Sequence, residues 1–415
     1  MHVHYSITNV RVKVNLLYFS NMSVNNIIPG SNLLLERNYT LRFLSFLWKN
    51  KLQHNVEEHA LFPYKLINPS EIQTDLINSK SKPYHSISYN DKMHRKTEDI
   101  DTFMKKTEST AFLVMKNNEI ITERYYNDYS RDSLFRVYSI TKSFTSALIG
   151  IALQEGLIKN IDDSIALYLP ELIDKTNSKY ITIRHLLLMN QGIEFNDAFY
   201  PWSENLKTYF HPNTRKFALD YSLDTISSEF IYNDYHPILL GMILERVTGK
   251  SVTQYLEEKL WHPMGCEYDA VFSCDSQKHM FEKPESGLNI RAIDLLRFGQ
   301  MYLNNGLVNG KQIIPQQWIF DSTSPLLETT HDRYKAYSNH PWGRQFFNKP
   351  DSYYKYFWWG NKVSETEFDY FALGIMGQVM YISPRNNTIA IRLGKKWNVH
   401  DWWPRILKAY IEQLD

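Results

Sequence analysis

Apolar and polar residues alternate in two neighbouring stretches of the chain, residues 110–115 and 119–126. The pair Asn117-Asn118 separates them. Asparagine tolerates the left-handed backbone of a tight turn, and strands of this length on either side of such a pair are typical of a β-hairpin. The pattern therefore predicts a hairpin over residues 110–126.

The hydrophobic spacing becomes helical in the middle of the chain. Gly249 and Ser251 are typical of a helix C-terminus followed at once by a new N-cap. Strand-like runs return at 379–382 and 388–393. Strands at both ends with helices between them predict a sheet domain split by a helical insert. The predicted helices cover residues 99–107, 139–157, 184–189, 237–247, 252–260, 292–303 and 402–414.

The first part of the chain has a different character. We interpret residues 1–85 as an N-terminal extension that ends in a polar, turn-prone linker at 78–83, and residues 86–415 as the main domain. The start lacks the continuous apolar core and the small-residue cleavage site of a secretory signal, so we expect a cytoplasmic protein. No apolar run reaches the roughly 18 residues that a membrane span requires.

Composition narrows the function classes. The 415 residues are 43% hydrophobic and 22% charged, with a net charge of +1, which argues against general attraction to nucleic acid or anionic membranes. Two cysteines cannot form a disulfide framework or a four-cysteine zinc site, and the histidines lack a third ligand at metal-binding spacing. We therefore expect no metal site. The oligomeric state is left open.

The first candidate for chemistry is Ser139-Ile-Thr-Lys142 at the start of an apolar helix. A serine and a lysine three residues apart lie on one helical face, and a nearby amine can accept or relay the proton of the hydroxyl. The alternative is an ordinary N-cap serine. The same spacing occurs in Ser79-x-x-Lys82, but that pair lies in the polar linker with no helix behind it.

Two further segments carry candidate residues. Tyr232, just before the helix at 237–247, is a candidate general base toward a serine and acid toward a leaving group. Gly374 precedes a strand and allows close approach to the backbone, so the N–H of Ile375 is a candidate oxyanion donor together with the N–H of Ser139. The alternatives are a packing tyrosine at position 232 and a β-bulge or tight turn at Gly374.

In this order along the chain, these segments resemble those of the serine β-lactamase and penicillin-binding-protein superfamily. The resemblance covers roughly residues 100–400 and is nearest to the class C-like branch that contains 6-aminohexanoate-dimer (nylon-oligomer) hydrolases and related esterases. It is carried by the stretches around Phe135–Phe144, Ile183–Gly192, Leu239–Gly249, Trp261–Gly265, Arg291–Gly299 and Ile314–Trp318.

The resemblance implies an α+β, β-lactamase-like fold: an antiparallel sheet flanked by helices, with an inserted all-α subdomain. The sheet part would take about residues 98–138 and 286–415, and the helical part about 139–285. Ser139 would be acylated, Lys142 would assist it and Tyr232 would shuttle the proton. The substrate would be a small ester or amide, and no metal or organic cofactor would take part.

Two departures from the family pattern bear on the substrate. The late strand of β-lactamases begins with Lys-Thr-Gly, whereas this chain has Ala372-Leu-Gly374, which removes the usual partner of a substrate carboxylate. Asp234 stands where the family commonly has Asn or Ser. Near Lys142 it would keep the ammonium charged; alternatively, it would pair with a cationic part of the substrate.

Aromatic residues are candidates for the substrate pocket. In relatives, the loop after the segment ending at Gly192 supplies an aromatic lid, and Phe199 or Tyr200 is expected to fill that place. Trp358, in Phe357-Trp-Trp-Gly360, is a candidate for lining an acyl pocket, against the alternative of core packing.

The favoured hypothesis is a serine hydrolase that cleaves an amide or ester through an acyl-enzyme on Ser139. Asp234 and Ala372 keep a second hypothesis open, in which the fold serves binding or assembly with weak catalysis. A third is a true β-lactamase or D-Ala-D-Ala carboxypeptidase.

Overall fold

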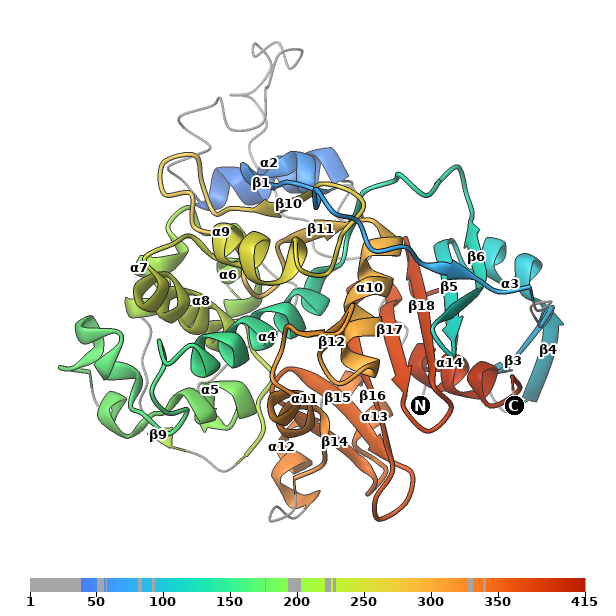
Figure 1. Ribbon diagram of the computed structural model, residues 1–415. Coiled ribbons are helices and arrows are strands. Elements are labelled where there is room, and N and C mark those ends of the chain that lie inside the picture. The colour runs from blue at the N-terminus through green and yellow to red at the C-terminus, as the bar shows by residue number, and fades with distance from the viewer. Residues whose placement is uncertain are drawn as a thin grey trace, which may run out of the picture.

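The computed structural model places a broad sheet beside a group of helices (Figure 1). The residues that it describes are 39–50, 56, 58–80, 84–91, 94–175, 177–192, 203–220, 225–226, 229–326, 331–338, 341–414.

The predicted hairpin is confirmed and lies inside the largest sheet. Strand β5 (Ser109–Lys116) pairs with β6 (Glu119–Tyr125) in antiparallel fashion. Asn117 and Asn118 have φ of 53° and 62°, so both turn residues adopt the left-handed backbone that a two-residue hairpin requires.

The largest sheet has the strand order β14-β15-β16-β17-β18-β5-β6-β2. Its other strands are β14 (Ser352–Lys355), β15 (Trp358–Lys362), β16 (Phe368–Gly374), β17 (Gln378–Ser383), β18 (Thr388–Gly394) and β2 (Ile77–Asn78). Neighbours are antiparallel except β2 and β6, which are parallel. The early and late strands of the chain thus meet where β5 pairs with β18.

A second sheet has the order β1-β10-β11-β7, with β1 (Tyr64–Ile67), β10 (Ala270–Ser273), β11 (Leu288–Ile290) and β7 (Phe135–Arg136). The remaining strands of the described residues form three two-stranded ribbons: β3 (Ser86–Asp91) with β4 (His94–Asp99), β8 (Gln191–Gly192) with β9 (Thr225–Ile226), and β12 (Leu307–Val308) with β13 (Lys311–Gln312).

Each helix that the sequence predicted is present within a few residues of its expected bounds. The helices are α2 (Tyr39–Asn50), α3 (Ile100–Lys106), α4 (Thr141–Gln154), α5 (Ile183–Leu188), α6 (Glu204–Phe210), α7 (Thr214–Asp220), α8 (Tyr235–Thr248), α9 (Val252–Leu256), α10 (Ala292–Leu303), α11 (Gln316–Thr323), α12 (Lys335–Ser338), α13 (Pro341–Phe346) and α14 (Trp403–Ile411). Gly249 ends α8 with φ of 66°, and Ser251 caps α9 in a capping box with Gln254.

Helices cover both faces of the largest sheet. Gly299 of α10 packs against Met380 and Ile389, whereas Trp403 of α14 packs against Arg392 from the other face. Helices α4 to α9 gather on one side of this sheet (Figure 1). The architecture is the predicted α+β fold. The part expected to be all helical, about residues 139–285, is not purely so, because it also contains β8, β9 and β10, and β10 gains its strand form by pairing with β1 and β11. Within the described ranges, no helix is long and apolar enough to cross a bilayer.

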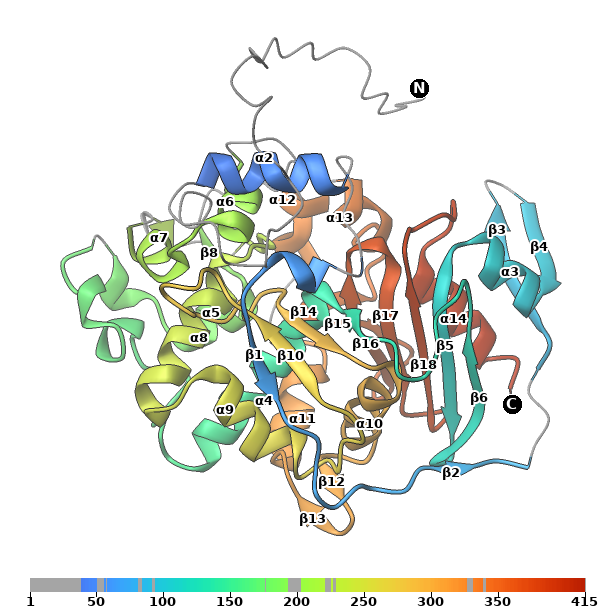
Figure 2. The same ribbon diagram turned by 90° about the horizontal axis from the view of Figure 1, so that it is seen from above.

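Residues 64–78, which we call the strap, run from β1 to β2 across the domain (Figure 2). A side chain at Gly265 would collide with the strap, because a Cβ there would lie 2.4 Å from the Thr74 backbone nitrogen. Thr74 N–H also donates to the Gly265 carbonyl at 3.0 Å. The boundary near residue 85 remains a prediction, but the strap before it is packed into the fold.

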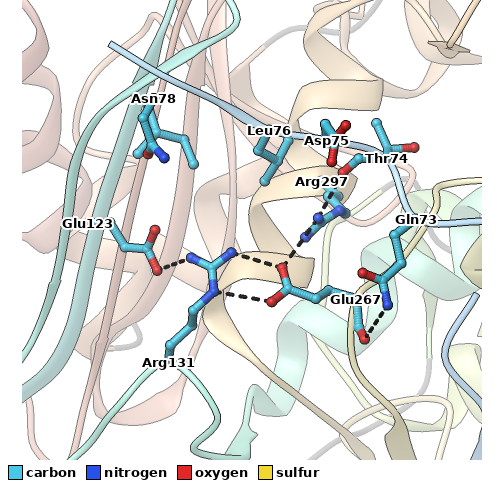
Figure 3. Close-up of a pocket in the computed structure, with 10 residues that line it drawn as sticks. Gln73, Thr74, Asp75, Leu76, Asn78, Glu123, Arg131, Glu267 and Arg297 are labelled. Carbon is cyan, nitrogen blue, oxygen red and sulfur yellow. Dashed lines mark hydrogen bonds and ion pairs between the residues drawn. The ribbon is translucent and has the colours of Figure 1, made fainter. Parts of the chain in front are cut away.

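Charged side chains line a small pocket of about 150 Å³ beneath the strap (Figure 3). Glu267 lies 2.8 Å from Arg131 and 3.5 Å from Arg297, and Arg131 also pairs with Glu123. Arg297 donates to the Thr74 carbonyl at 2.9 Å. These charges pair with one another, and Arg297 ties the strap to α10, while the pairing of β2 with β6 holds its far end.

Candidate active site

Ser139 lies on a sharp turn between a strand and a helix. The chain leaves β7, passes through the short 3-10 turn Tyr138–Ile140 and enters α4 at Thr141. Tyr138 has φ of 49°, a conformation that non-glycine residues adopt at some energetic cost and that is often found at functional sites. Ser139 is therefore presented at the start of α4 and is only partly buried.

Lys142 occupies the first turn of α4, on the same face as Ser139. Its side chain is 1% exposed. The Nζ atom lies 3.0 Å from Ser139 Oγ, 2.7 Å from Asp234 Oδ1 and 2.9 Å from the carbonyl oxygen of Glu285. An ammonium has three donors. The three contacts therefore account for all of them and fix the orientation of the group toward the hydroxyl.

Opposing effects act on the charge of Lys142. Burial works to lower the pKa of the amine, but Asp234, together with Tyr232 and Glu285, outweighs this and raises the pKa above its ordinary value. The first of the two predicted arrangements of Asp234, a contact with Lys142, is thus present. Its side chain is 14% exposed, so it is also open to solvent on one side.

Tyr232 approaches from the loop that leads into α8. Lys142 Nζ lies 5.0 Å from the centre of its ring. Burial raises the pKa of the Tyr232 phenol, whereas the Lys142 charge and hydrogen bonding with Ser139 and Lys142 work to lower it. The backbone of this loop is anchored, because Ile231 N–H donates to the Met189 carbonyl at 2.9 Å. Folding therefore brings the hydroxyl, the ammonium and the phenol together.

Aromatic rings surround Tyr232. The ring centres of Trp359, Tyr354 and Tyr337 lie 5.5, 5.8 and 6.3 Å from its own. Trp358, the candidate from the sequence, points to the opposite face of β15, where it is 0% exposed and packs against Tyr302 at 4.5 Å. Successive strand residues face opposite sides. Trp359 therefore takes the position beside the site, and Trp358 packs the core.

The end of β16 lies against the turn that carries Ser139. A Cβ on Gly374 would approach the Val137 carbonyl oxygen to 2.5 Å, so only glycine fits there. Ile375 follows at once, in the short helical turn Ile375–Gly377, and is partly exposed. The two segments with candidate oxyanion donors are thus in contact. Ala372 lies within β16, opposite Met380.

Two of the predicted residues, Phe199 and Tyr200, lie outside the described residues. Sequence reasoning missed Glu285, whose carbonyl oxygen accepts from Lys142, and Trp359. A backbone acceptor leaves no side-chain signature. For Trp359 the signal was present, since strand alternation places only one of two adjacent tryptophans on a given face.

Comparisons with known proteins agree with this geometry. The β-lactamase family model matches residues 97–401. The chain is 24% identical to the 6-aminohexanoate-dimer hydrolase of Paenarthrobacter ureafaciens over 317 residues, covering 73% of this chain and 76% of that protein. It is 26% identical to protein flp of Staphylococcus aureus (strain MW2) over 164 residues, 37% of this chain and 33% of that protein.

Solved structures show the same fold. A Bacillus anthracis protein described as a candidate 6-aminohexanoate-dimer hydrolase superposes with a TM-score of 0.69 at 20% identity, over 94% of this chain and 98% of that one. A penicillin-binding protein from Bacillus halodurans gives a TM-score of 0.55 at 16% identity, over 76% and 99%. With a serine and a lysine in hydrogen-bond contact and a family match over most of its length, the chain belongs to the β-lactamase family and is a serine hydrolase.

Proposed function

We propose that this serine hydrolase cleaves an amide or ester bond by acylation of Ser139, with Lys142 and Tyr232 handling the proton. The observation that carries the proposal is the contact of 3.0 Å between Ser139 Oγ and Lys142 Nζ in a site where the ammonium has two further fixed acceptors. A hydroxyl is a weak nucleophile until a neighbouring group takes its proton. Lys142 and Tyr232 lie beside Ser139 and are the candidates for this role.

Lys142 acts as a charged group. Because Asp234 raises the pKa of Lys142, the ammonium persists at neutral pH and stabilises the developing alkoxide of Ser139. When Lys142 takes a proton from the serine, it passes another proton on, so the lysine acts as a proton relay and stays charged.

Tyr232 accepts the serine proton in its phenolate form and returns it to the leaving group. The Lys142 ammonium beside the ring favours this anion. Because burial raises the pKa of Tyr232, the phenolate fraction grows with pH, and activity is expected to rise from neutral to alkaline pH. In Tyr232→Phe, kcat is expected to fall by about 10²- to 10⁴-fold, the usual contribution of a general acid–base group.

The carbonyl oxygen of the substrate would sit on the backbone N–H groups of Ser139 and Ile375. The close contact between Gly374 and Val137 supports this, because it holds the two segments at a fixed separation. Water then releases the acyl group from Ser139.

The substrate is an uncharged or weakly charged acyl compound. Ala372 and Leu373 offer no cation to a substrate carboxylate, and a charge-assisted hydrogen bond contributes about 1.5–3 kcal/mol. We therefore expect esters and linear amides to react faster than β-lactams or D-Ala-D-Ala peptides. Phe199 and Tyr200 remain the candidates for an aromatic lid over the acyl group.

A fluorophosphonate probe tests the nucleophile. The native chain should be labelled, Ser139→Ala should not, and Ser79→Ala, which removes the other serine with the same spacing, should be labelled as the native chain is. Labelling of Ser139→Ala would overturn the proposal. Absence of labelling in the folded native chain would favour the alternative of a fold kept for binding or assembly.

Turnover assays then sort the substrate class. The panel contains short acyl esters, linear amides without a free carboxylate, and one chromogenic β-lactam. Hydrolysis of the esters or amides, with slow or no turnover of the β-lactam, is the expected result. Fastest turnover of the β-lactam would assign the protein to the third hypothesis instead.

A further inference from the structure

A buried ion pair lies behind the active site and takes no part in the chemistry proposed above. Lys283 Nζ is 3.4 Å from Glu285 Oε1, and both side chains are 0% exposed. Burial raises the pKa of the Glu285 carboxyl and lowers that of the Lys283 amine, so each charge depends on the other. Such a pair is costly to bury, which raises the question of what it does.

Residue 285 connects this pair to the site. Its carbonyl oxygen accepts from Lys142 Nζ at 2.9 Å, while its carboxylate pairs with Lys283. The preceding carbonyl, that of Pro284, accepts from Thr145 Oγ1 at 2.9 Å, one turn further along α4. The orientation of the Glu285 side chain and the direction of its carbonyl are therefore set together.

Aromatic rings close over the pair. Lys283 Nζ lies 5.5 Å from the ring centre of Phe62 and 5.3 Å from that of Tyr209, and donates to the Thr208 carbonyl at 3.2 Å. The Tyr209 hydroxyl in turn donates to Glu58. Glu58 and Phe62 precede residue 97, where the match to the β-lactamase family begins.

The same cover also contacts the segment that leads to Ser139. The Arg136 guanidinium lies 5.2 Å from the ring centres of both Phe62 and Tyr209. Arg136 N–H donates to the Val56 carbonyl at 3.0 Å. Arg136 stands three residues before Ser139, so the segment around residues 56–62 supports both chain segments that meet at Lys142.

We propose that Lys283 and Glu285, closed in by Phe62, are positioning residues that hold the Glu285 carbonyl against Lys142 and so orient the ammonium toward Ser139. The inference rests on the proposed function. It assigns a role in catalysis to a part of the chain that lies before the matched family region.

Steady-state kinetics of ester hydrolysis by the full chain test this role. Glu285→Gln keeps the side-chain shape but removes the charge. We expect kcat to fall about ten- to hundredfold, because small displacements of a catalytic group have effects of that size. KM should change little, since the substrate is not contacted. The alkaline limb of the pH profile should move to lower pH, because the Glu285 carboxylate helps to raise the pKa of Lys142.

The matched control is Lys65→Met. Lys65 Nζ lies 3.0 Å from Glu282 Oε1, so this variant breaks an ion pair that joins the N-terminal part of the chain to the stretch containing Lys283 and Glu285. It does not touch the surroundings of Lys142, and its kcat should equal that of the native chain.

The double variant Glu285→Gln, Lys283→Met separates positioning from stability. It leaves no unpaired buried charge, so its melting temperature should recover relative to either single variant. The proposal requires kcat to stay low in it; recovery of kcat along with stability would overturn the proposal, as would a native kcat in Glu285→Gln. If a single variant does not fold, the double variant is used in its place. Phe62→Leu provides a second test, because it should lower kcat and leave KM unchanged; a native kcat in Phe62→Leu would count against the proposal.

Probe labelling distinguishes this inference from the proposed function. If Ser139→Ala is still labelled, the proposed function has failed. If Ser139→Ala is unlabelled and Glu285→Gln is labelled at the native rate, only the positioning role has failed.

Discussion

Among the buried cation–carboxylate pairs of the described residues, two have a similar make-up but different consequences. Lys142 and Asp234 lie 2.7 Å apart at the start of α4, and Arg297 and Asp294 lie 3.2 Å apart on α10. Both cations are almost fully buried, at 1% and 3% exposure. The difference lies in the other partners of each cation.

Lys142 faces a hydroxyl and a phenol, two groups that are able to exchange protons, whereas Arg297 faces the Thr74 carbonyl and the Glu267 carboxylate. An arginine also keeps its proton at all ordinary pH values. One pair can therefore take part in proton transfer, while the other ties the strap to α10. A buried charge pair alone does not mark an active site; its neighbours do.

The largest expected effect comes from removing each cation in turn. Lys142→Met should lower kcat/KM by about 10⁴-fold or more, the scale found when a member of a catalytic unit is removed. Arg297→Met should leave kcat/KM close to native at a temperature where the variant is folded. Ester hydrolysis with circular dichroism as a folding control measures both. Equal losses in the two variants would show that the comparison is wrong.

Stability should respond in the opposite order. Arg297→Met leaves Asp294, which is 0% exposed, without its cation, and removal of one partner of a buried pair costs about 3–5 kcal/mol. Lys142→Met should cost less, because Asp234 is partly open to water. Urea unfolding of the two variants gives the free energies directly. A larger loss in Lys142→Met would contradict the assignment.

The pH dependence of stability sharpens the comparison further. Burial raises the pKa of Asp294 to about 6. A carboxyl with a raised folded-state pKa stabilises the fold fully below its unfolded pKa, and this contribution is lost as pH rises through the folded value. The free energy of unfolding should therefore fall by about 3 kcal/mol between about pH 4 and 6, since each pKa unit of difference corresponds to about 1.36 kcal/mol. Asp294→Asn should flatten the unfolding free energy over this range, and an unchanged slope would contradict the prediction.

The smallest expected effect concerns Asp234. Its carboxylate raises the pKa of Lys142, so Asp234→Asn should lower that pKa and move the alkaline limb of kcat to lower pH. Below the limb, kcat should fall only modestly, about tenfold or less, because the asparagine still accepts a hydrogen bond from Lys142. Rates measured between pH 7 and 11 test this. Asp294→Asn is the control and should leave the limb in place.

Local signals account for what the sequence could predict. The Asn117-Asn118 turn, the Gly249 C-cap and the Ser251 N-cap act over a few residues, and each was found where the pattern indicated. Ser139 and Lys142 were accessible for the same reason, since helical spacing alone places them on one face.

Contacts between distant segments were not accessible in this way. The Glu285 carbonyl reaches Lys142 only through the tertiary fold, and the identity of a side chain does not indicate that its backbone oxygen accepts a hydrogen bond from a distant residue. Likewise, the sequence of the strap shows no strand pattern, because its strand β1 forms only through pairing with the distant β10. Tyr232 was found through the order of family motifs rather than through any local pattern.

The pairing of β1 with β10 has a consequence for how the protein is made. Tyr64 lies opposite Ser273, and Lys116 of β5 opposite Thr388 of β18. Neither pairing can form on the ribosome until the far strand has been synthesised, and such distant contacts slow folding. The early segments, Phe62 among them, therefore stay without these partners until β10 and β18 have been synthesised, and the largest sheet closes only after that point.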